Sequence, residues 1–243
     1  MKKLLLLFIT IVSCSDSEEF FENSYCIENI NLIDAKKGLK ENMTIVISKN
    51  EIIKIEKTSN LKLSEKNKIY DGTDKFIIPG LWDSHVHFAF ERELASSMFN
   101  LFMAYGITSV RDTGGEINFL KKWKNKSISN PNLLPRVKIA GPLIDGKFNV
   151  YNGNSVYFPP LSVRTASIEE TEAQVKELIQ NGVDFLKAYE MLTPEQLQVI
   201  TKIAKENQLK VTGHIPLSMD VITASNMGLN SIEHLRNIEM SST

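Results

Sequence analysis

The sequence contains little cysteine, little histidine and no block of like charge. Its 243 residues include two cysteines and four histidines, and the formal net charge is −1. Without a basic block, nothing indicates nucleic-acid binding. Two cysteines cannot build a disulfide framework, so we expect Cys26 to pack as a small apolar side chain. The length and an ordinary composition predict one or two globular domains with a sizeable core.

The N-terminus lacks an apolar run long enough to span a bilayer. Two lysines precede the apolar residues 4–12, a pattern typical of a signal peptide. Residues 11–14 then resemble a bacterial lipobox, in which Cys14 is lipidated and becomes the mature N-terminus. We predict a signal peptide over residues 1–14, a polar tether over 15–24, and a lipid anchor at Cys14 in the bacterial cell envelope (membrane, periplasm or exterior). A plain signal peptide that is cut nearby is the alternative.

The two segments that follow differ in their hydrophobic pattern. Residues 25–78 contain short alternating stretches separated by turns, which predict a small antiparallel sheet. From residue 79 to 243, apolar strands alternate with amphipathic helices, which predicts α/β structure with a parallel sheet and crossover helices. The repeated unit indicates an incomplete (β/α) TIM-type barrel of about six strands. The expected strands are residues 81–87, 108–112, 136–140, 184–189, 209–214 and 231–234.

A long segment, residues 142–166, is rich in glycine, asparagine, tyrosine and proline and is predicted to be a loop. Loops of this length inside compact domains are often functional. Its aromatic residues Tyr151, Tyr157 and Phe158 either contact a substrate or pack the loop. We expect helices around it at residues 91–105, 117–124 and 167–180, and one that begins after Thr193.

The histidines stand at the ends of predicted strands. His85 and His87 alternate along one strand, so they share a face and can hold one metal ion. Asp83 on the same face could orient one of them. His214 and His234 also end strands, and functional residues of (β/α) barrels gather at these carboxyl ends. A His-x-His pair alone is more often structural, but four histidines in this position indicate a metal site.

Three further residues are candidates for the pocket. Lys187 alternates with Tyr189 on the inward face of its strand, where a lysine is costly unless it is paired or neutralised; it could instead extend to the rim. Tyr189 is a plausible pocket wall. Asp112 precedes two glycines and either lines the pocket or caps the turn.

These motifs together resemble the amidohydrolase superfamily, particularly its imidazolonepropionase-like and dipeptidase-like branches. The resemblance extends over residues 25–240 and implies that the sheet of residues 25–78 is part of a β-sandwich beside the barrel. It rests on PGLWDSHVH at 79–87, RDTGG at 111–115, Lys187, His214, and SIEH at 231–234. It implies a hydrolase of carbon–nitrogen bonds in small amides, cyclic amides or dipeptides, acting through a metal-activated hydroxide.

The resemblance also implies roles for individual residues. His85 and His87 would bind a first divalent ion, usually zinc, and His214 and His234 a second. Lys187, carboxylated by carbon dioxide, would bridge the two ions, and Lys187, His214 and His234 would serve catalysis. Neutral imidazoles suit zinc, and a carbamate removes the cost of burying a cation.

The sequence departs from the pattern of the amidohydrolase superfamily after its sixth expected strand, residues 231–234. That family has eight barrel strands, with a metal-binding aspartate on the eighth, and residues 235–243 supply neither. We expect a fragment of a longer gene or a decayed gene rather than a split enzyme. The alternative function is therefore an inactive or fragmentary envelope lipoprotein that at most binds metal. After His214 comes an Ile-Pro pair, which leaves the substrate branch open, and a deaminase remains a further alternative.

Overall fold

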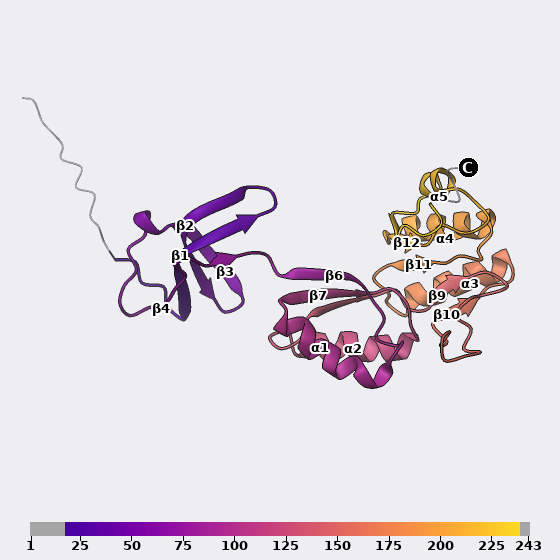
Figure 1. Ribbon diagram of the computed structural model, residues 1–243, viewed down its shortest axis with the longest axis horizontal. Helices are drawn as coiled ribbons and strands as arrows, with labels where there is room; N and C mark the ends of the chain where they lie inside the picture. The colour runs from indigo at the N-terminus through magenta and orange to yellow at the C-terminus, as the bar shows by residue number, and fades with distance from the viewer. Residues whose placement is uncertain (1–17, 239–243) are drawn as a thin grey trace, which may run out of the picture. The chain divides into compact units, whose positions relative to one another are not determined.

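The computed structural model describes residues 18–238, so the predicted signal peptide and Cys14 lie outside the described residues. The chain divides into two compact units after Pro79. We describe each unit by itself (Figure 1). Within residues 18–238, no helix combines the length and the apolar character needed to cross a membrane.

The first unit is one mixed five-stranded sheet. β2 pairs antiparallel with β1 and β3, but β4 and β5 both run parallel to β1. The prediction of a purely antiparallel sheet is thus wrong, because alternation shows which face a side chain takes but not the direction of its neighbour. Cys26 is fully buried beside Val46 and Leu61, as predicted. The elements are β1 (Ser24–Asp34), β2 (Gly38–Ser48), β3 (Glu51–Lys57), a 3-10 turn (Thr58–Asn60), β4 (Lys68–Asp71) and β5 (Phe76–Ile77).

The described part of the predicted tether is attached to this sheet. The Glu19 N–H donates to the Lys62 carbonyl at 2.8 Å, and Glu19 in turn accepts from the Ser64 N–H at 3.0 Å. Phe21 packs against the cluster around Cys26. Residues 19–24 are therefore part of the first unit. One apolar side chain and two backbone hydrogen bonds hold them there, although their polar composition predicted a tether.

The second unit contains two parallel sheets in a partial barrel-like arrangement. The first sheet has the order β6-β7-β8 and the second β10-β9-β11-β12-β13. Asp184 links them, since its N–H donates to the Ile139 carbonyl and its carboxylate accepts from the Ile139 N–H. The strands are β6 (Leu81–Val86), β7 (Ile107–Asp112), β8 (Arg136–Ile139), β9 (Leu143–Asp145), β10 (Ser162–Arg164), β11 (Leu186–Ala188), β12 (Val211–Gly213) and β13 (Ser231–Ile232).

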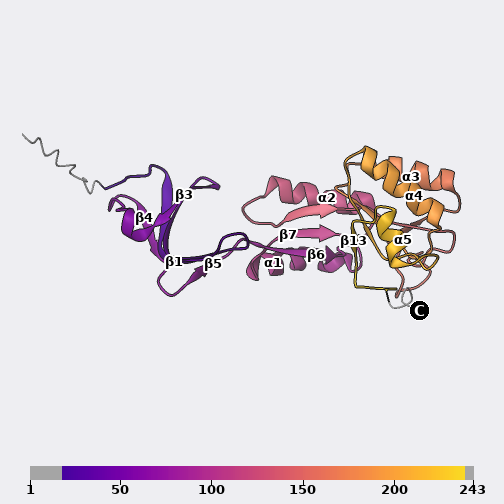
Figure 2. The same ribbon diagram turned by 90° about the horizontal axis from the view of Figure 1, so that it is seen from above.

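Helices cover both sheets. α1 and α2 lie along one side of β6 and β7 (Figure 1), and α3 packs against α4 beside the second sheet (Figure 2). Under the first sheet, the Phe99 and Trp123 rings stack with centroids 4.6 Å apart. The helices are a 3-10 turn (Arg92–Leu94), α1 (Ala95–Ala104), α2 (Ile117–Ser129), α3 (Ile168–Gln180), α4 (Pro194–Glu206) and α5 (Val221–Asn226).

The sequence signals of α4 explain its position. Thr193 and Gln196 form a reciprocal capping box, and Pro194 takes the first helical position, where its missing N–H costs nothing. Leu197 and Ile200 are fully buried on the face toward the sheet. This helix therefore begins where the sequence predicts and fixes the strands on either side of it.

The predicted loop over residues 142–166 contains structure. β9 and β10 form a parallel pair at its two ends. Between them, the buried Asp145 carboxylate accepts from the backbone N–H groups of Gly146, Val150 and Met191. These bonds tie the segment to the end of β11. Strands of three residues are too short to show a period, so composition alone predicted a loop.

Candidate active site

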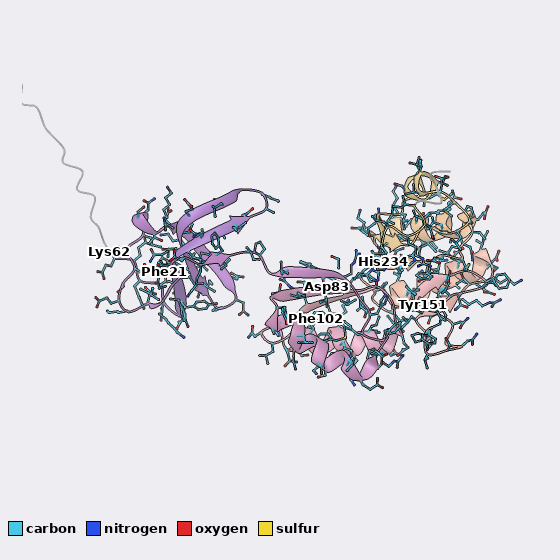
Figure 3. The ribbon with its side chains drawn as sticks, viewed as in Figure 1. Phe21, Lys62, Asp83, Phe102, Tyr151 and His234 are labelled. Carbon is cyan, nitrogen blue, oxygen red and sulfur yellow. The ribbon has the colours of Figure 1, made fainter. Side chains whose placement is uncertain are left out.

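All four histidines of the sequence surround one cavity of about 240 Å³ in the second unit. The cavity lies at the carboxyl ends of the parallel strands, near the labels of His234 and Tyr151, while Asp83 lies further back along β6 (Figure 3). The rest of its lining is Leu143, Tyr151, Lys187, Tyr189 and Arg236.

His85 and His87 direct the same ring nitrogen toward each other. Their Nε2 atoms are 3.1 Å apart. The His87 Nδ1 contacts the Gly114 carbonyl at 2.9 Å, and a carbonyl only accepts, so Nδ1 carries the proton and Nε2 the lone pair. Burial lowers the pKa of His87 to about 4, which keeps this ring neutral near pH 7. The lone pair of His87 therefore faces His85 Nε2, and the predicted pair directs both Nε2 atoms to one point.

Lys187 points inward and does not extend to the rim. Only 1% of the residue is exposed, and its Nζ has no hydrogen-bond partner in the described part of the chain. Burial lowers the pKa of this amine to about 7. A large fraction of Lys187 is thus an uncharged, nucleophilic amine at neutral pH.

His214 is held from behind by a carboxylate that sequence reasoning missed. Its Nδ1 lies 2.7 Å from Glu190 Oε1, and the same oxygen accepts from Arg236 Nε at 2.6 Å. Burial, helped by the positive charge of Lys187, lowers the pKa of His214 to about 3. The Tyr189 ring packs on the imidazole with centroids 4.5 Å apart.

His234 lies beyond the end of β13 rather than on the strand. Its φ is +62°, a left-handed conformation that is uncommon for residues other than glycine. Its ring centroid is 4.2 Å from that of His85 and 5.5 Å from that of His214. The predicted strand end is therefore a turn, which places His234 between the other histidines. Strained backbone of this kind clusters at functional sites.

Glu233 is the second carboxylate that sequence reasoning missed. It accepts from Arg111 at 2.6 Å and from the Thr212 hydroxyl, and contacts His85 Nδ1 at 2.6 Å. Burial opposes its ionisation, but the bonds from His85 and Thr212 and the charges of Lys187 and Arg111 outweigh burial and lower its pKa. Its only sequence signal is its place inside SIEH.

Asp83 and Asp112, the two carboxylates that the sequence suggested near the site, are bound to backbone N–H groups. Asp83 accepts from the backbone N–H of His85 at 3.1 Å and does not contact the imidazole. Asp112 is fully buried and accepts from the N–H groups of Phe88 and Gly114. It does not line the cavity, which corrects its prediction as a substrate contact and matches the turn-capping alternative. Burial raises its pKa to about 7.

The predicted aromatic residues divide into two groups. Tyr151 and Tyr189 line the cavity, with ring centroids 5.9 Å apart and edge-to-face geometry. Tyr157 is 78% exposed, and Phe158 supports Tyr151 from outside. The long segment between β9 and β10 therefore contributes one tyrosine to the cavity wall.

The donor set fits a divalent ion such as zinc, although among residues 18–238 no three His, Cys, Asp or Glu side chains are already arranged to hold one together. His87 Nε2 is an acceptor, so its 3.1 Å contact with His85 Nε2 holds either a proton or a cation. The distance approaches the roughly 3.3 Å between two nitrogens on one tetrahedral zinc at about 2.05 Å. Lys187 adds a buried amine without a partner.

Fold and site define a (β/α)-barrel protein with a histidine-rich cavity at the carboxyl ends of its strands. No protein-family model matches the chain. It is 32% identical over 101 residues to an imidazolonepropionase of Pseudoalteromonas atlantica, a match of 37% of this chain and 25% of that protein. It is 40% identical over 62 residues to a dihydroorotase of Clostridioides difficile, a match of 26% of this chain and 14% of that protein.

Solved structures share the fold over most of the chain. A Xaa-Pro dipeptidase with methionine bound in its active site matches with a TM-score of 0.71 and 24% identity, over 86% of this chain and 61% of that one. A prolidase in complex with N-methylphosphonate-L-proline matches with a TM-score of 0.70 and 17% identity, over 86% and 60%. The chain thus spans part of the length of each relative. In fold and in local sequence, the chain is thus similar to proteins of the amidohydrolase superfamily, which is the resemblance that the motifs predict.

Proposed function

We propose that this protein is a metal-dependent hydrolase of carbon–nitrogen bonds in small amides or dipeptides. One observation carries the proposal: the Nε2 atoms of His85 and His87 face each other at 3.1 Å beside the unpartnered amine of Lys187. The names of the similar proteins, an imidazolonepropionase, a dihydroorotase, a dipeptidase and a prolidase, support the same reaction class.

One or two divalent ions, with zinc as the best fit, would be held by the cavity side chains. His85 and His87 would bind the first ion, and His214 and His234 the second. A bound ion supplies Lewis acidity, which polarises a scissile carbonyl and lowers the pKa of water to give hydroxide near neutral pH. Arg236 and Glu190 keep His214 directed toward the cavity.

Lys187 would join the two sites as a carbamate. Its uncharged amine attacks the carbon of carbon dioxide, and the nitrogen then loses a proton to give an anionic N-carboxylate. The low pKa of the amine, caused by burial, makes the nucleophilic form abundant at neutral pH. The product is an oxygen donor, and the burial cost of the cation disappears.

The cavity walls favour a substrate that carries a carboxylate. Apart from Lys187, which is proposed as a carbamate, their charged member is Arg236, whereas Glu190 and Glu233 stand behind histidines and do not line the cavity. The Arg236 side chain is 60% exposed and can meet an anionic group at the rim. Tyr151 and Tyr189 form an aromatic wall. A dipeptide therefore suits this cavity better than a neutral cyclic amide.

Location is a further part of the proposal. It rests on the sequence of residues 1–14, which predicts a signal peptide and a lipid anchor at Cys14 in the bacterial envelope. In cells treated with globomycin, an unprocessed precursor should accumulate. Normal processing under the drug would remove the lipid anchor from the proposal.

The test of the hydrolase combines metal analysis with substrates. Purified protein is supplied with zinc and bicarbonate, its bound metal is measured, and panels of dipeptides and cyclic amides are assayed for hydrolysis. We expect bound zinc and dipeptide cleavage, both lost in His85→Asn and Lys187→Ala. The control Glu172→Gln alters an exposed ion pair with Lys176 and should change neither. No tightly bound metal would refute the site; bound zinc without hydrolysis would favour the inactive alternative.

A further inference from the structure

One carboxylate ties the last described strand to three others. Glu233 follows β13, is 8% exposed, and contacts residues of β6, β7 and β12. Its Oε2 lies 2.6 Å from His85 Nδ1, and its Oε1 accepts from Arg111 Nη2 at 2.6 Å and from the Thr212 hydroxyl. Both oxygens are thus occupied, each by a group from a different part of the barrel.

We propose that Glu233 is the positioning residue that fixes the tautomer and the direction of His85 for metal binding. This inference rests on the metal centre proposed above. A carboxylate whose other oxygen accepts two donors presents Oε2 as an acceptor, so His85 Nδ1 bears the proton. Nε2 is then the nitrogen left to bind the ion, and it faces His87 Nε2 in the cavity. Carboxylates behind ligand histidines act in this way in many metal sites.

Arg111 holds this carboxylate in place. Its Nε donates to the Ser84 carbonyl at 2.8 Å, and its guanidinium lies over the Phe185 ring, 5.1 Å from the centroid. The planar group is therefore fixed at two points before it meets Glu233. Rotation of the Glu233 carboxylate would break the bonds from Arg111 and Thr212, so the oxygen that faces His85 keeps its position.

The other histidines with a fixed Nδ1 do not need Glu233. His87 donates to the Gly114 carbonyl, and His214 contacts Glu190. Asp83, the near neighbour of His85, is engaged by the backbone. Among the described residues, the side-chain partner of the His85 Nδ1 is therefore Glu233, 148 positions later in the chain.

The experiment first reads the tautomer in metal-free protein. Two-bond ¹⁵N–¹H correlation spectra distinguish Nδ1-H from Nε2-H rings, and with four histidines the His85 signals can be assigned by their loss in His85→Gln. We expect wild-type His85 to carry a proton on Nδ1, together with any proton that Nε2 shares with His87, and we expect a shift toward Nε2-H alone in Glu233→Gln. A wild-type ring without a proton on Nδ1 would overturn the inference, and this readout needs no metal.

The second readout is metal affinity. Zinc is titrated against a chromogenic chelator, and the visible spectrum of the cobalt form reports ligand geometry. Glu233→Gln should weaken zinc binding by about 10- to 100-fold and change the cobalt spectrum. Glu233→Asp, which keeps the charge on a shorter side chain, should restore part of the affinity. Glu172→Gln serves as the matched control at an exposed ion pair.

The outcomes separate the two proposals. If wild-type protein binds no zinc, the proposal of a metal centre is refuted. The protonation of His85 in metal-free protein then still tests whether Glu233 positions this ring. If wild type binds zinc and Glu233→Gln shows the same tautomer and an affinity within twofold, the positioning role is refuted and the metal centre stands.

Discussion

Replacing Lys187 by methionine should stabilise the metal-free protein while abolishing hydrolysis. The side chain is 1% exposed and its Nζ has no hydrogen-bond partner among the described residues, so the folded state must either bury a cation or give up a proton. Methionine has a similar length and no charge, and it fits irregular space well. The substitution therefore removes a cost of folding.

The magnitude follows from the pKa of this amine, which burial lowers from 10.5 to about 7. Between these two values the unfolded chain binds more protons than the folded one, so the free energy of unfolding of the wild type rises with pH in that window. The penalty removed by the substitution is about 5 kcal/mol below pH 7 and about 2 kcal/mol at pH 9. The stabilisation by Lys187→Met should thus shrink as pH rises.

Urea denaturation at pH 6, 7.5 and 9, with chelator present and bicarbonate absent, measures this difference. The control Lys202→Met changes a lysine whose residue is exposed on α4 and should give no pH-dependent difference. Two results would show that this amine is charged and paired in the folded protein. One is a Lys187→Met variant that is less stable than wild type at pH 6. The other is a difference in free energy of unfolding between the two proteins that is the same at all three pH values.

Three more outcomes are expected. Asp112→Asn should gain stability relative to wild type as pH rises from 4 to 7, by up to about 4 kcal/mol. In that window the carboxyl ionises in the unfolded chain but stays protonated in the folded one, so the free energy of unfolding of the wild type falls; urea titration at several pH values measures the difference. Leu197→Ala leaves a cavity under α4 and should cost about 2–5 kcal/mol, seen as a lower urea midpoint. Gly146→Ala places a Cβ 1.8 Å from the Met191 carbonyl oxygen, so a lower melting temperature and weaker dipeptide cleavage should follow.

Local patterns in the sequence predicted much of the site. Alternation along one strand placed His85 beside His87, and the same alternation directed Lys187 inward. The capping box at Thr193 fixed the start of α4. These features depend on residues close in the chain, where backbone geometry alone determines which side chains share a face.

Other features depend on partners far apart in the chain. Glu233 lies beside His234 in sequence, yet it contacts His85, and no periodicity joins two strands separated by so many residues. Glu190 follows the inward Tyr189, so alternation along the strand gives no signal that it contacts His214. β9 and β10 are three residues each, too short for a pattern, and only their pairing identifies them.

The contact between His85 and Glu233 joins residues 148 positions apart, and this separation has a consequence for the order of folding. Contacts of high sequence separation form late, because the chain between them must first be ordered. The neighbouring His85 and His87 can meet as soon as β6 exists, but their support arrives with the segment after β13. An ion captured by the nascent chain would be held by an imidazole that still rotates. If the proposed metal centre forms, tight binding would favour the fully folded chain by mass action.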